Sequence, residues 1–188
     1  QLLLAVPTGV PGLKVAAPYD LVALGASQTG QLEFHGVEVS RDLRIAGPVE
    51  HVLRPGRAAG TGGLQTSTLA VGLADAALEY LERESQRRIE LVEPSAALRQ
   101  EWRQVRERLL EVAEGASNCT SEQLRAQANS LVLRATQSAL VAAKGTGYVA
   151  GHPAGRWCQE ALFFLVWSCP QGVLTSNLCE WAGIEGTV

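Results

Sequence analysis

Two glycines that follow a long helical pattern form the first candidate binding element of this chain. Residues 144–167, with the sequence KGTGYVAGHPAGRWCQEALFFLVW, place Gly145 and Gly147 directly behind an alanine-rich run. Glycine lets another group approach the backbone closely, and free backbone N–H groups at such a corner suit an anion such as a phosphate. Glycine also supplies the positive φ that ends many helices. The pair therefore predicts either an anion contact or a simple helix C-cap.

The histidines, the cysteines and a second glycine cluster add no recognisable catalytic or metal-binding pattern. His35 and His51 are isolated, and His152, which precedes Pro153, is typical of the start of a helix. Residues 60–63 resemble a phosphate-binding corner, but no strand and no Lys-Ser/Thr pair accompany them as in a P-loop. The cysteines lack metal-ligand spacing, so we expect no metal and reduced, buried thiols at Cys119, Cys158, Cys169 and Cys179.

Composition and charge exclude several classes of protein. The 188 residues are 46% hydrophobic and 19% charged, with a formal net charge of -3, which is typical of a globular chain and gives no basic face for nucleic acid. The longest apolar run is far below the ~20 residues of a membrane helix, and no signal peptide pattern opens the sequence. We therefore expect a cytoplasmic protein. The first residue is Gln1 and Met is absent, so we also expect a piece of a longer chain.

The first 53 residues carry short apolar runs separated by turn residues. Residues 2–6 and 13–17 are apolar, and residues 32–39 alternate imperfectly between apolar and polar, which predicts three or four antiparallel strands. So few strands cannot bury both of their faces, so we expect further sheet or helices to cover them. Residues 54–63, RPGRAAGTGG, predict a linker to a second domain that spans residues 64–188.

The second part of the chain shows helical periodicity from Leu64 onward. The first helix has its apolar stripe at Leu69, Leu73, Ala76 and Tyr80, and Pro94-Ser95 is expected to end it and to cap the next helix. The second helix ends at Gly115 and leaves four arginines on its outer face, at Arg99, Arg103, Arg106 and Arg108. Its apolar heptad consists of Leu98, Trp102, Val105, Leu109 and Val112.

Three further helices complete the predicted domain. Residues 120–123, Thr-Ser-Glu-Gln, form a capping box, and the many alanines behind it indicate a central helix that its neighbours approach closely. A fourth helix is expected from Pro153 to about Ser168, with residues 161–167 buried because they are apolar on every side. Pro170 then starts a short fifth helix. The fold class is α+β: a partial antiparallel β-domain followed by an up-and-down four-helix bundle.

The motif order supports a resemblance to a known family. A helix, Gly-x-Gly-Tyr, His-Pro, an arginine three residues after the proline and a later Glu-Ala pair resemble the C-terminal domain of acyl-CoA dehydrogenases. Residues 2–48 are similar to the end of that family's middle β-domain, and the chain from about Thr61 onward is similar to its C-terminal bundle. The resemblance covers nearly the whole chain but only the back half of such an enzyme.

The resemblance implies a function and two cofactor-binding elements. It implies FAD between the β-domain and the bundle, across a subunit interface, and oxidation of the Cα–Cβ bond of an acyl-CoA or related thioester. Gly145 and Gly147 would touch the adenosine diphosphate part of FAD, although Lys144 replaces the first glycine of the family's pair. Arg88, late in the first helix, would pair with the flavin pyrophosphate. The alternative for Arg88 is a solvated helix arginine.

The catalytic base that the resemblance implies is missing from both of its usual positions. The glutamate that follows the buried helix of the family falls at Ser168, and the alternative position on the first bundle helix falls at Gly62. A serine without a partner base has no strong reason to remove a carbon-bound proton. Glu160 and Glu180 are the nearest carboxylates in sequence. Arg156 either pairs with Glu160 at i+4 or meets a phosphate or another subunit.

Three hypotheses for the whole protein follow. The first is an FAD-dependent oxidoreductase of the acyl-CoA dehydrogenase type whose base comes from elsewhere. The second is a non-catalytic partner or structural subunit that keeps the bundle for assembly. The third is a flavin monooxygenase or oxidase on the same fold, which needs no thioester base at that place. In each case alanine-rich bundle helices and exposed tryptophans predict a homo-oligomer, a dimer or tetramer, or association with a related subunit.

Overall fold

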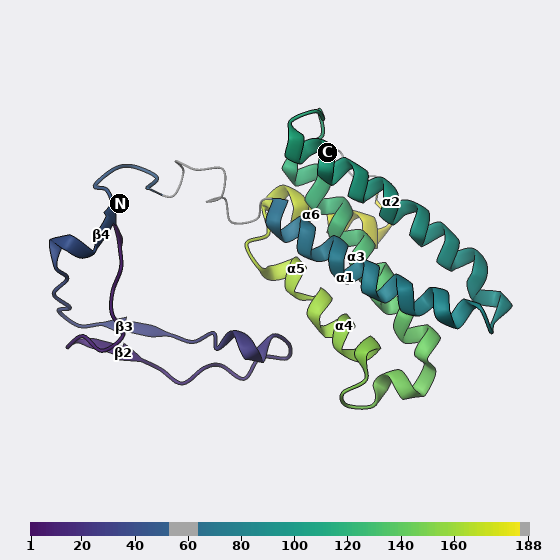
Figure 1. The fold of residues 1–188 in the computed structure, drawn as a ribbon, viewed down its shortest axis with the longest axis horizontal. Helices are drawn as coiled ribbons and strands as arrows, with labels where there is room; N and C mark the ends of the chain where they lie inside the picture. Colours follow the sequence, from purple (N-terminus) through teal and green to yellow (C-terminus); the bar gives the residue numbers. More distant parts are fainter. Residues whose placement is uncertain (53–63, 185–188) are drawn as a thin grey trace. The chain divides into compact units, whose positions relative to one another are not determined.

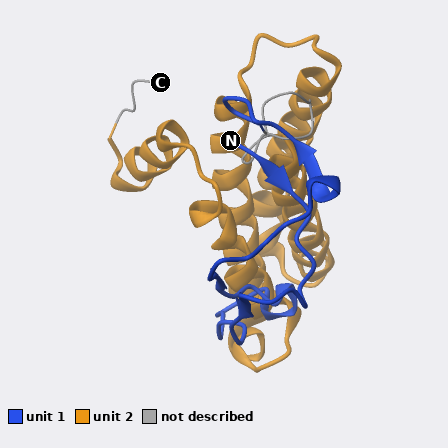
Figure 2. Cartoon of the chain, turned by 90° about the vertical axis from the view of Figure 1, so that its left-hand side faces the viewer, with its two compact units in different colours: residues 1–61 blue, residues 62–188 orange. Residues whose placement is uncertain are grey.

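The computed structural model describes residues 1–52 and 64–184, which belong to two compact units, residues 1–61 and residues 62–188 (Figure 1). Figure 2 shows the short strands in the first unit and the long helices in the second. The predicted linker, residues 54–63, lies outside the described residues. Gly62, one of the two expected base positions, lies outside them as well.

The first unit is built from short antiparallel strand pairs. Strand β1 (Leu3–Leu4) pairs with β4 (Arg44–Ala46), and β2 (Leu13–Val15) pairs with β3 (Leu32–Phe34). The strand expected over residues 32–39 ends early, because Gly36 adopts a φ of 59° and turns the chain. The side chain of Phe34 is 55% exposed, so this small sheet has no core of its own, as expected for an incomplete β-domain. Short 3₁₀ turns separate the strands, η1 (Gly25–Ser27) and η2 (Arg41–Leu43).

The second unit is an up-and-down helical bundle centred on α3 (Figure 1). Helix α3 packs against α1, α2, α4 and α6, and its buried face is mainly alanine and leucine. These small residues let α1 approach closely, which confirms the prediction of a central helix. The bounds of the helices are α1 (Leu64–Ser85), α2 (Val92–Glu114), α3 (Ser121–Ala143), α4 (Pro153–Ala161), α5 (Phe163–Val166) and α6 (Gln171–Ala182). Two 3₁₀ turns, η3 (Ile89–Leu91) and η4 (Lys144–Tyr148), precede α2 and follow α3.

The buried stripe of α1 differs from the predicted one. Leu69, predicted to face the core, is 62% exposed, whereas Ala70, Ala74, Leu78 and Leu81 are almost fully buried. Two alanines occupy the line of closest contact with α3, where larger side chains would hold the helices apart. Because alanine is a weaker apolar signal than leucine, the sequence pattern was assigned to the neighbouring face of the helix.

The end of α1 was also predicted too late. The helix ends at Ser85, and Arg88 follows in an extended conformation with a φ of -139°, so Arg88 does not lie in the helix. Helix α2 begins at Val92, with Pro94 inside its first turn. Proline is tolerated there because the N–H groups of a first turn have no helical partner. Ser95 is therefore not the N-cap; it is buried in α2, and its hydroxyl has no hydrogen-bond partner.

Arg99 was expected on the outer face of α2, but it forms ion pairs that connect α2 to α1. Its side chain is only 11% exposed. The guanidinium donates to both carboxylate oxygens of Glu82, at 2.7 and 2.9 Å, and to Asp75 Oδ1 at 2.5 Å. It also lies 4.8 Å from the ring centre of Trp102, whose indole N–H donates to the carbonyl of Val71 at 3.0 Å. The remaining heptad residues of α2 pack into the core as predicted.

The apolar stretch at the end of the bundle is not a buried helix. The predicted fourth helix is interrupted at Leu162, which separates α4 from α5. Ala161 and Phe164 are buried, but Leu162 is 48%, Val166 80% and Trp167 52% exposed. Phe163, Phe164 and Leu165 pack in or against the core, whereas Leu162, Val166 and Trp167 have no cover within the described residues. Pro170 precedes α6 as predicted.

The capping box of α3 is present, and it supplies a direct test of the bundle. The hydroxyl of Thr120 accepts from the backbone N–H of Gln123 at 3.1 Å, and the Gln123 amide oxygen accepts from the N–H of Thr120 at 3.0 Å. We expect Thr120→Ala to lower stability by about 1 kcal/mol and the thermal midpoint by about 2–4 °C. Thermal unfolding followed by circular dichroism measures this. Thr175→Ala, at an exposed position of α6 where the hydroxyl makes no hydrogen bond within the described residues, is the matched control, and equal losses in both variants would contradict the capping assignment.

The Glu82–Arg99 pair makes the stability of the bundle pH-dependent. The hydrogen bond from Arg99 lowers the pKa of Glu82 below its ordinary value of 4.5. A carboxylate with a lowered pKa in the folded state stabilises the fold above that ordinary value and loses its contribution as the pH falls through the lower, folded value. We therefore expect Glu82→Gln to flatten the pH dependence of urea unfolding in acid. Glu79→Gln, on the exposed face of α1, should retain the wild-type dependence, and two identical profiles would contradict the assignment.

Candidate functional site

The glycine corner follows α3, but the glycines do not provide the turn in the way the sequence suggested. The residue with positive φ is Lys144, at 54°, and neither glycine has that conformation. A Cβ on Gly147 would lie 2.7 Å from Ala143 Cβ and 2.8 Å from a methyl of Leu140, so packing requires glycine there. A Cβ on Gly145 would meet nothing within 4 Å. Gly147 is therefore a packing residue, and Gly145 leaves an open, exposed stretch of backbone.

The first turn of helix α4 contacts this corner through Gly155, a residue that the sequence analysis did not identify. A Cβ on Gly155 would lie 2.5 Å from the carbonyl oxygen of Gly147, so the two segments touch through their backbones. His152 Nδ1 accepts from the N–H of Ala154 at 3.2 Å, which confirms His152 as a residue of the helix start. The ring of Tyr80, from α1, meets the ring of His152 edge-on at 5.9 Å. The glycine in the first turn of the predicted fourth helix was the available signal.

Arg88 lies at the same end of the bundle as the glycine corner. Its Nη2 donates to the carbonyl of Ala142, in the last turn of α3, at 2.5 Å and to Glu84 Oε2 at 3.2 Å. The side chain is 18% exposed, and its Nε is buried without a hydrogen-bond partner. Arg88 is thus not a solvated helix arginine, and its structural hydrogen bonds use only one of its three side-chain nitrogens. It satisfies one free carbonyl of a helix end and retains further N–H donors beside residues 144–148.

Ser168 lies in the turn between α5 and α6, residues 167–170. It is exposed and has a φ of 44°, a left-handed backbone conformation that residues other than glycine rarely adopt. The two alternative carboxylates are both engaged. Glu160 pairs with Arg156 at 3.4 Å, as the i,i+4 spacing suggested. Glu180 accepts from the hydroxyl of Ser130 at 2.5 Å.

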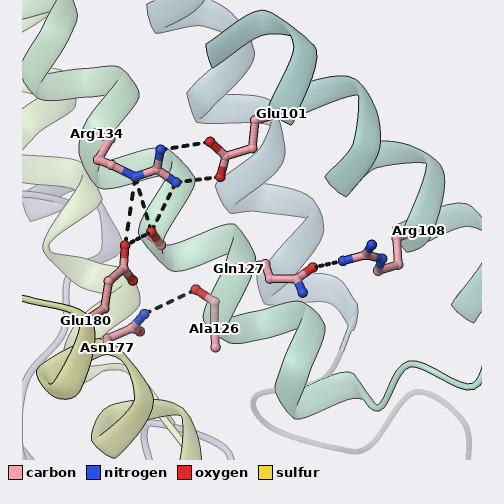
Figure 3. A network of polar contacts seen from close by, with 8 residues as sticks. Glu101, Arg108, Ala126, Gln127, Arg134, Asn177 and Glu180 are labelled. Carbon is pink, nitrogen blue, oxygen red and sulfur yellow. Dashed lines mark hydrogen bonds and ion pairs between the residues drawn. The ribbon is translucent and has the colours of Figure 1, made fainter. Parts of the chain in front are cut away.

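Glu180 belongs to a polar network that joins three helices (Figure 3). Arg134 of α3 donates to both carboxylate oxygens of Glu101 on α2, at 2.8 and 2.5 Å, and its Nε lies 4.0 Å from Glu180 on α6. The hydrogen bond to Glu101 raises the pKa of Arg134. The network connects α2 and α6 to α3. Glu101, Arg134 and Glu180 therefore stabilise the packing of these helices, and none of the three is a free acid or base.

A second polar cluster is buried in α3, and the sequence analysis did not identify it. Arg125 is fully buried and donates from Nε to Asn129 Oδ1 at 2.9 Å. Its Nη2 donates to the carbonyl of Phe164 at 3.0 Å and to that of Trp167 at 3.4 Å, whereas Nη1 has no partner. Burial lowers the pKa of Arg125. An arginine near the start of an alanine-rich helix was the signal that could have drawn attention to it.

The remaining sequence predictions concern metal sites, cysteines and membrane helices. In residues 1–52 and 64–184, no group of three or more His, Cys, Asp and Glu side chains could hold a metal ion. The four cysteines are free thiols, and they are half-buried and not fully buried as expected. Burial raises the pKa of Cys158 and of Cys169. None of the helices in the described part of the chain combines the length and the apolar character that a membrane span requires.

Comparison with solved structures identifies the fold. No protein-family model and no curated protein matches the sequence. The butyryl-CoA dehydrogenase of Megasphaera elsdenii is 18% identical and superposes with a TM-score of 0.74 over 96% of this chain and 51% of its own. The acyl-CoA dehydrogenase of Geobacillus kaustophilus is 14% identical, with a TM-score of 0.76 over 97% of this chain and 52% of its own. The glutaryl-CoA dehydrogenase of Mycobacterium smegmatis, solved in complex with FADH2, is 16% identical, with a TM-score of 0.72 over 100% of this chain and 52% of its own.

This is the acyl-CoA dehydrogenase fold. The match covers the C-terminal helical domain and part of the β-domain, which confirms the resemblance and the fold class predicted from the sequence. The chain spans about half the length of the solved structures that it matches. At identities below 20% the likeness establishes the fold, and the site residues of an acyl-CoA dehydrogenase remain predictions for this chain.

The two glycines of the corner give a matched pair of variants. We expect Gly147→Ala to destabilise the bundle by about 1–3 kcal/mol, because its methyl group overlaps Ala143 and Leu140. Gly145→Ala should have little effect on stability, because its methyl group meets open space. Chemical denaturation of both variants tests this. Equal stability of the two variants would contradict the packing role of Gly147.

Proposed function

We propose that this chain contributes the helical wall of the cofactor site in an FAD-dependent oxidoreductase of the acyl-CoA dehydrogenase type. The observation that supports the proposal best is the hydrogen bond from Arg88 to Ala142, in the last turn of α3, which places Arg88 at the end of the bundle where the corner at residues 144–148 follows. These two elements were predicted separately, from positions more than fifty residues apart. When bound, FAD would supply a hydride acceptor for the Cβ of an acyl thioester.

The residues at this end of the bundle suit the phosphates of FAD. The side chain of Arg88 is 18% exposed, and its Nη1 makes no hydrogen bond within the described residues, so a phosphate oxygen could accept from Nη1 without displacing a protein hydrogen bond. Gly145 exposes its backbone beside Lys144, whose side chain is also exposed. Partial burial strengthens such contacts, because they are less screened than contacts in open water. Arg88 and Gly145 are therefore our proposed cofactor-binding residues, with Gly147 supporting the corner from behind.

The chemistry at the thioester is less complete. Removal of an α-proton needs a positioned base, and a serine hydroxyl without a partner base does not serve. Ser168 is such a serine, and Glu160 and Glu180 are engaged elsewhere. Neither Ser168 nor these two carboxylates therefore offers a free base, and we propose that position 168 of this chain lacks the base that the reaction needs.

Ser168 also favours a second candidate function. A non-catalytic partner or structural subunit would keep the bundle and need no carboxylate at this position. The large exposed apolar side chains Val166, Trp167 and Trp181 would suit either a homo-oligomer or association with a related subunit. A flavin monooxygenase or oxidase, which needs no base for an acyl thioester, is the remaining alternative on the same fold.

Cofactor binding by the full-length protein tests the proposal. We expect a yellow protein with a flavin absorbance spectrum, and we expect Arg88→Met to weaken FAD binding by about 10- to 100-fold, because a charge-assisted hydrogen bond is lost. Arg156→Met removes an exposed arginine of α4 and should leave the affinity unchanged. A full-length protein that purifies colourless and takes up no FAD would refute the proposal. Equal affinity of the Arg88 variant and the wild type would remove Arg88 from the site.

Flavin reduction by an acyl-CoA separates the candidate functions. A bleached flavin identifies a dehydrogenase, whereas an unchanged flavin favours the subunit or the monooxygenase. Because a general base contributes about 10²–10⁴-fold, we expect Ser168→Glu to accelerate bleaching by at least tenfold, and Ser168→Gln, which lacks the charge, not to do so. Stopped-flow absorbance measures these rates. Wild-type bleaching as fast as that of the glutamate variant would show that the base already lies elsewhere.

A further inference from the structure

Arg125 is a buried cation without a counter-charge. It is fully buried within α3, and none of the ion pairs found in residues 1–52 and 64–184 includes it. Taking a guanidinium out of water without a carboxylate is costly, and an apolar side chain of similar volume is often at least as stable. One of its nitrogens, Nη1, also lacks any hydrogen-bond partner. Global stability is therefore a poor explanation for an arginine at this position.

The groups that Arg125 does contact belong to the end of α5. The carbonyls of Phe164 and Trp167 both accept from its Nη2, and Phe164 also accepts from the amide of Asn129 at 3.1 Å. Carbonyls in the last turn of a helix have no partner within the helix. A cation beside them also interacts favourably with the negative end of the helix. Arg125 thus holds the exact point at which the chain leaves α5 for the turn of residues 167–170.

The same cluster reaches the helix on the other side of the turn. The amide of Asn129 donates to Asn177 Oδ1 on α6 at 3.3 Å. Figure 3 shows the second contact, in which the Asn177 amide donates to the carbonyl of Ala126 on α3 at 3.2 Å. Asn177 is itself buried. Both ends of the turn are therefore fastened to one face of α3 by polar groups.

Apolar packing holds α5 itself, because Phe164 is buried in the core and Phe163 and Leu165 pack against it, but it gives the end of the helix little support. Val166 is 80% and Trp167 52% exposed, and the ring of Trp167 stacks on that of Phe163, at the start of α5, at 5.4 Å. Ser168 is exposed and carries the unfavourable φ of 44°. A residue in such a conformation persists only where its surroundings impose it. In the described part of the chain, Arg125 is the side chain that bonds this turn, at the carbonyl of Trp167 directly before Ser168.

We propose that Arg125 is a positioning residue, which fixes the backbone at Trp167 and so sets the direction of the side chain at position 168. A lysine could not replace it fully, because one ammonium group cannot serve Asn129 and two carbonyls in the geometry of the guanidinium fork. The inference depends on the proposed function only in placing this turn beside the substrate. The restraint on the turn is a property of the bundle itself.

Hydrogen exchange of the full-length protein, read by mass spectrometry, tests the restraint. We expect Arg125→Met to increase amide exchange in residues 163–170 by about tenfold while exchange in the core of α1 stays near the wild-type rate. Arg125→Lys should give a smaller increase at the same residues. Arg134→Met, which removes the link from α3 to Glu101 and Glu180, is the matched control and should leave exchange in residues 163–170 unchanged. Unaltered exchange there in both Arg125 variants would overturn the inference.

Two further outcomes keep the test decisive. If Arg125→Met does not fold, Arg125→Lys alone decides, because it retains the charge and most of the volume. If exchange rises equally throughout the bundle, Arg125 supports the fold in general, and the positioning role is wrong.

A kinetic experiment separates this inference from the proposed function. In the Ser168→Glu protein, we expect Arg125→Lys to lower the rate of flavin reduction severalfold with no change in the acyl-CoA concentration at half-saturation. An unchanged rate would contradict the positioning role. If Ser168→Glu reduces no flavin at all while the exchange result holds, the proposed function fails and the restraint by Arg125 stands.

Discussion

The close approach of α1 to α3 is the constraint on which the rest of the bundle depends. Alanines at the contact, among them Ala70 and Ala74 on α1 and Ala135 and Ala139 on α3, are fully buried. Small side chains bring two helices together at the lower end of the usual interaxial distance. Arg88 follows α1 directly, and its contact with the last turn of α3 requires this proximity. The candidate cofactor site is therefore a consequence of helix packing.

Helix α3 serves the candidate site at both of its ends. Its C-terminal end leads into the corner at residues 144–148, where Gly147 and Gly155 allow the backbone of α4 to touch the corner. Its N-terminal half carries Arg125, which holds the turn after α5. One central helix thus fixes the position of both segments that sequence reasoning connected with a flavin enzyme, although Ser168 leaves the second without a base.

Sequence reasoning succeeded where a local interaction determines the structure. The capping box at Thr120, the stop at Gly115 and the start of a helix at Pro170 each depend on a few adjacent residues, and all three are confirmed. It failed where tertiary contact decides. Leu69 is exposed because alanines pack better against α3, and the side chain of Arg99 is mostly buried because Glu82 and Asp75 on another helix receive its hydrogen bonds. A periodicity pattern contains no information about such partners.

The candidate site shows the same division. The glycines were recognised, but their physical use differs from the predicted one, since Lys144 and not a glycine has the positive φ. The role of Arg125 could not be predicted, because its partners Phe164 and Trp167 are about forty residues away and contribute only backbone carbonyls. Fold and family resemblance were accessible from the sequence, whereas the polar contacts that fix the site depend on the packed structure.

The central claim is that Arg88 and the glycine corner form one wall of a flavin site. A crystal or electron cryo-microscopy structure of the full-length protein with FAD tests it most directly. We predict pyrophosphate or ribose phosphate oxygens within about 3.2 Å of the Arg88 guanidinium or the Gly145 backbone N–H. FAD bound at another part of the fold, with Arg88 contacting only Ala142 and Glu84, would contradict the account.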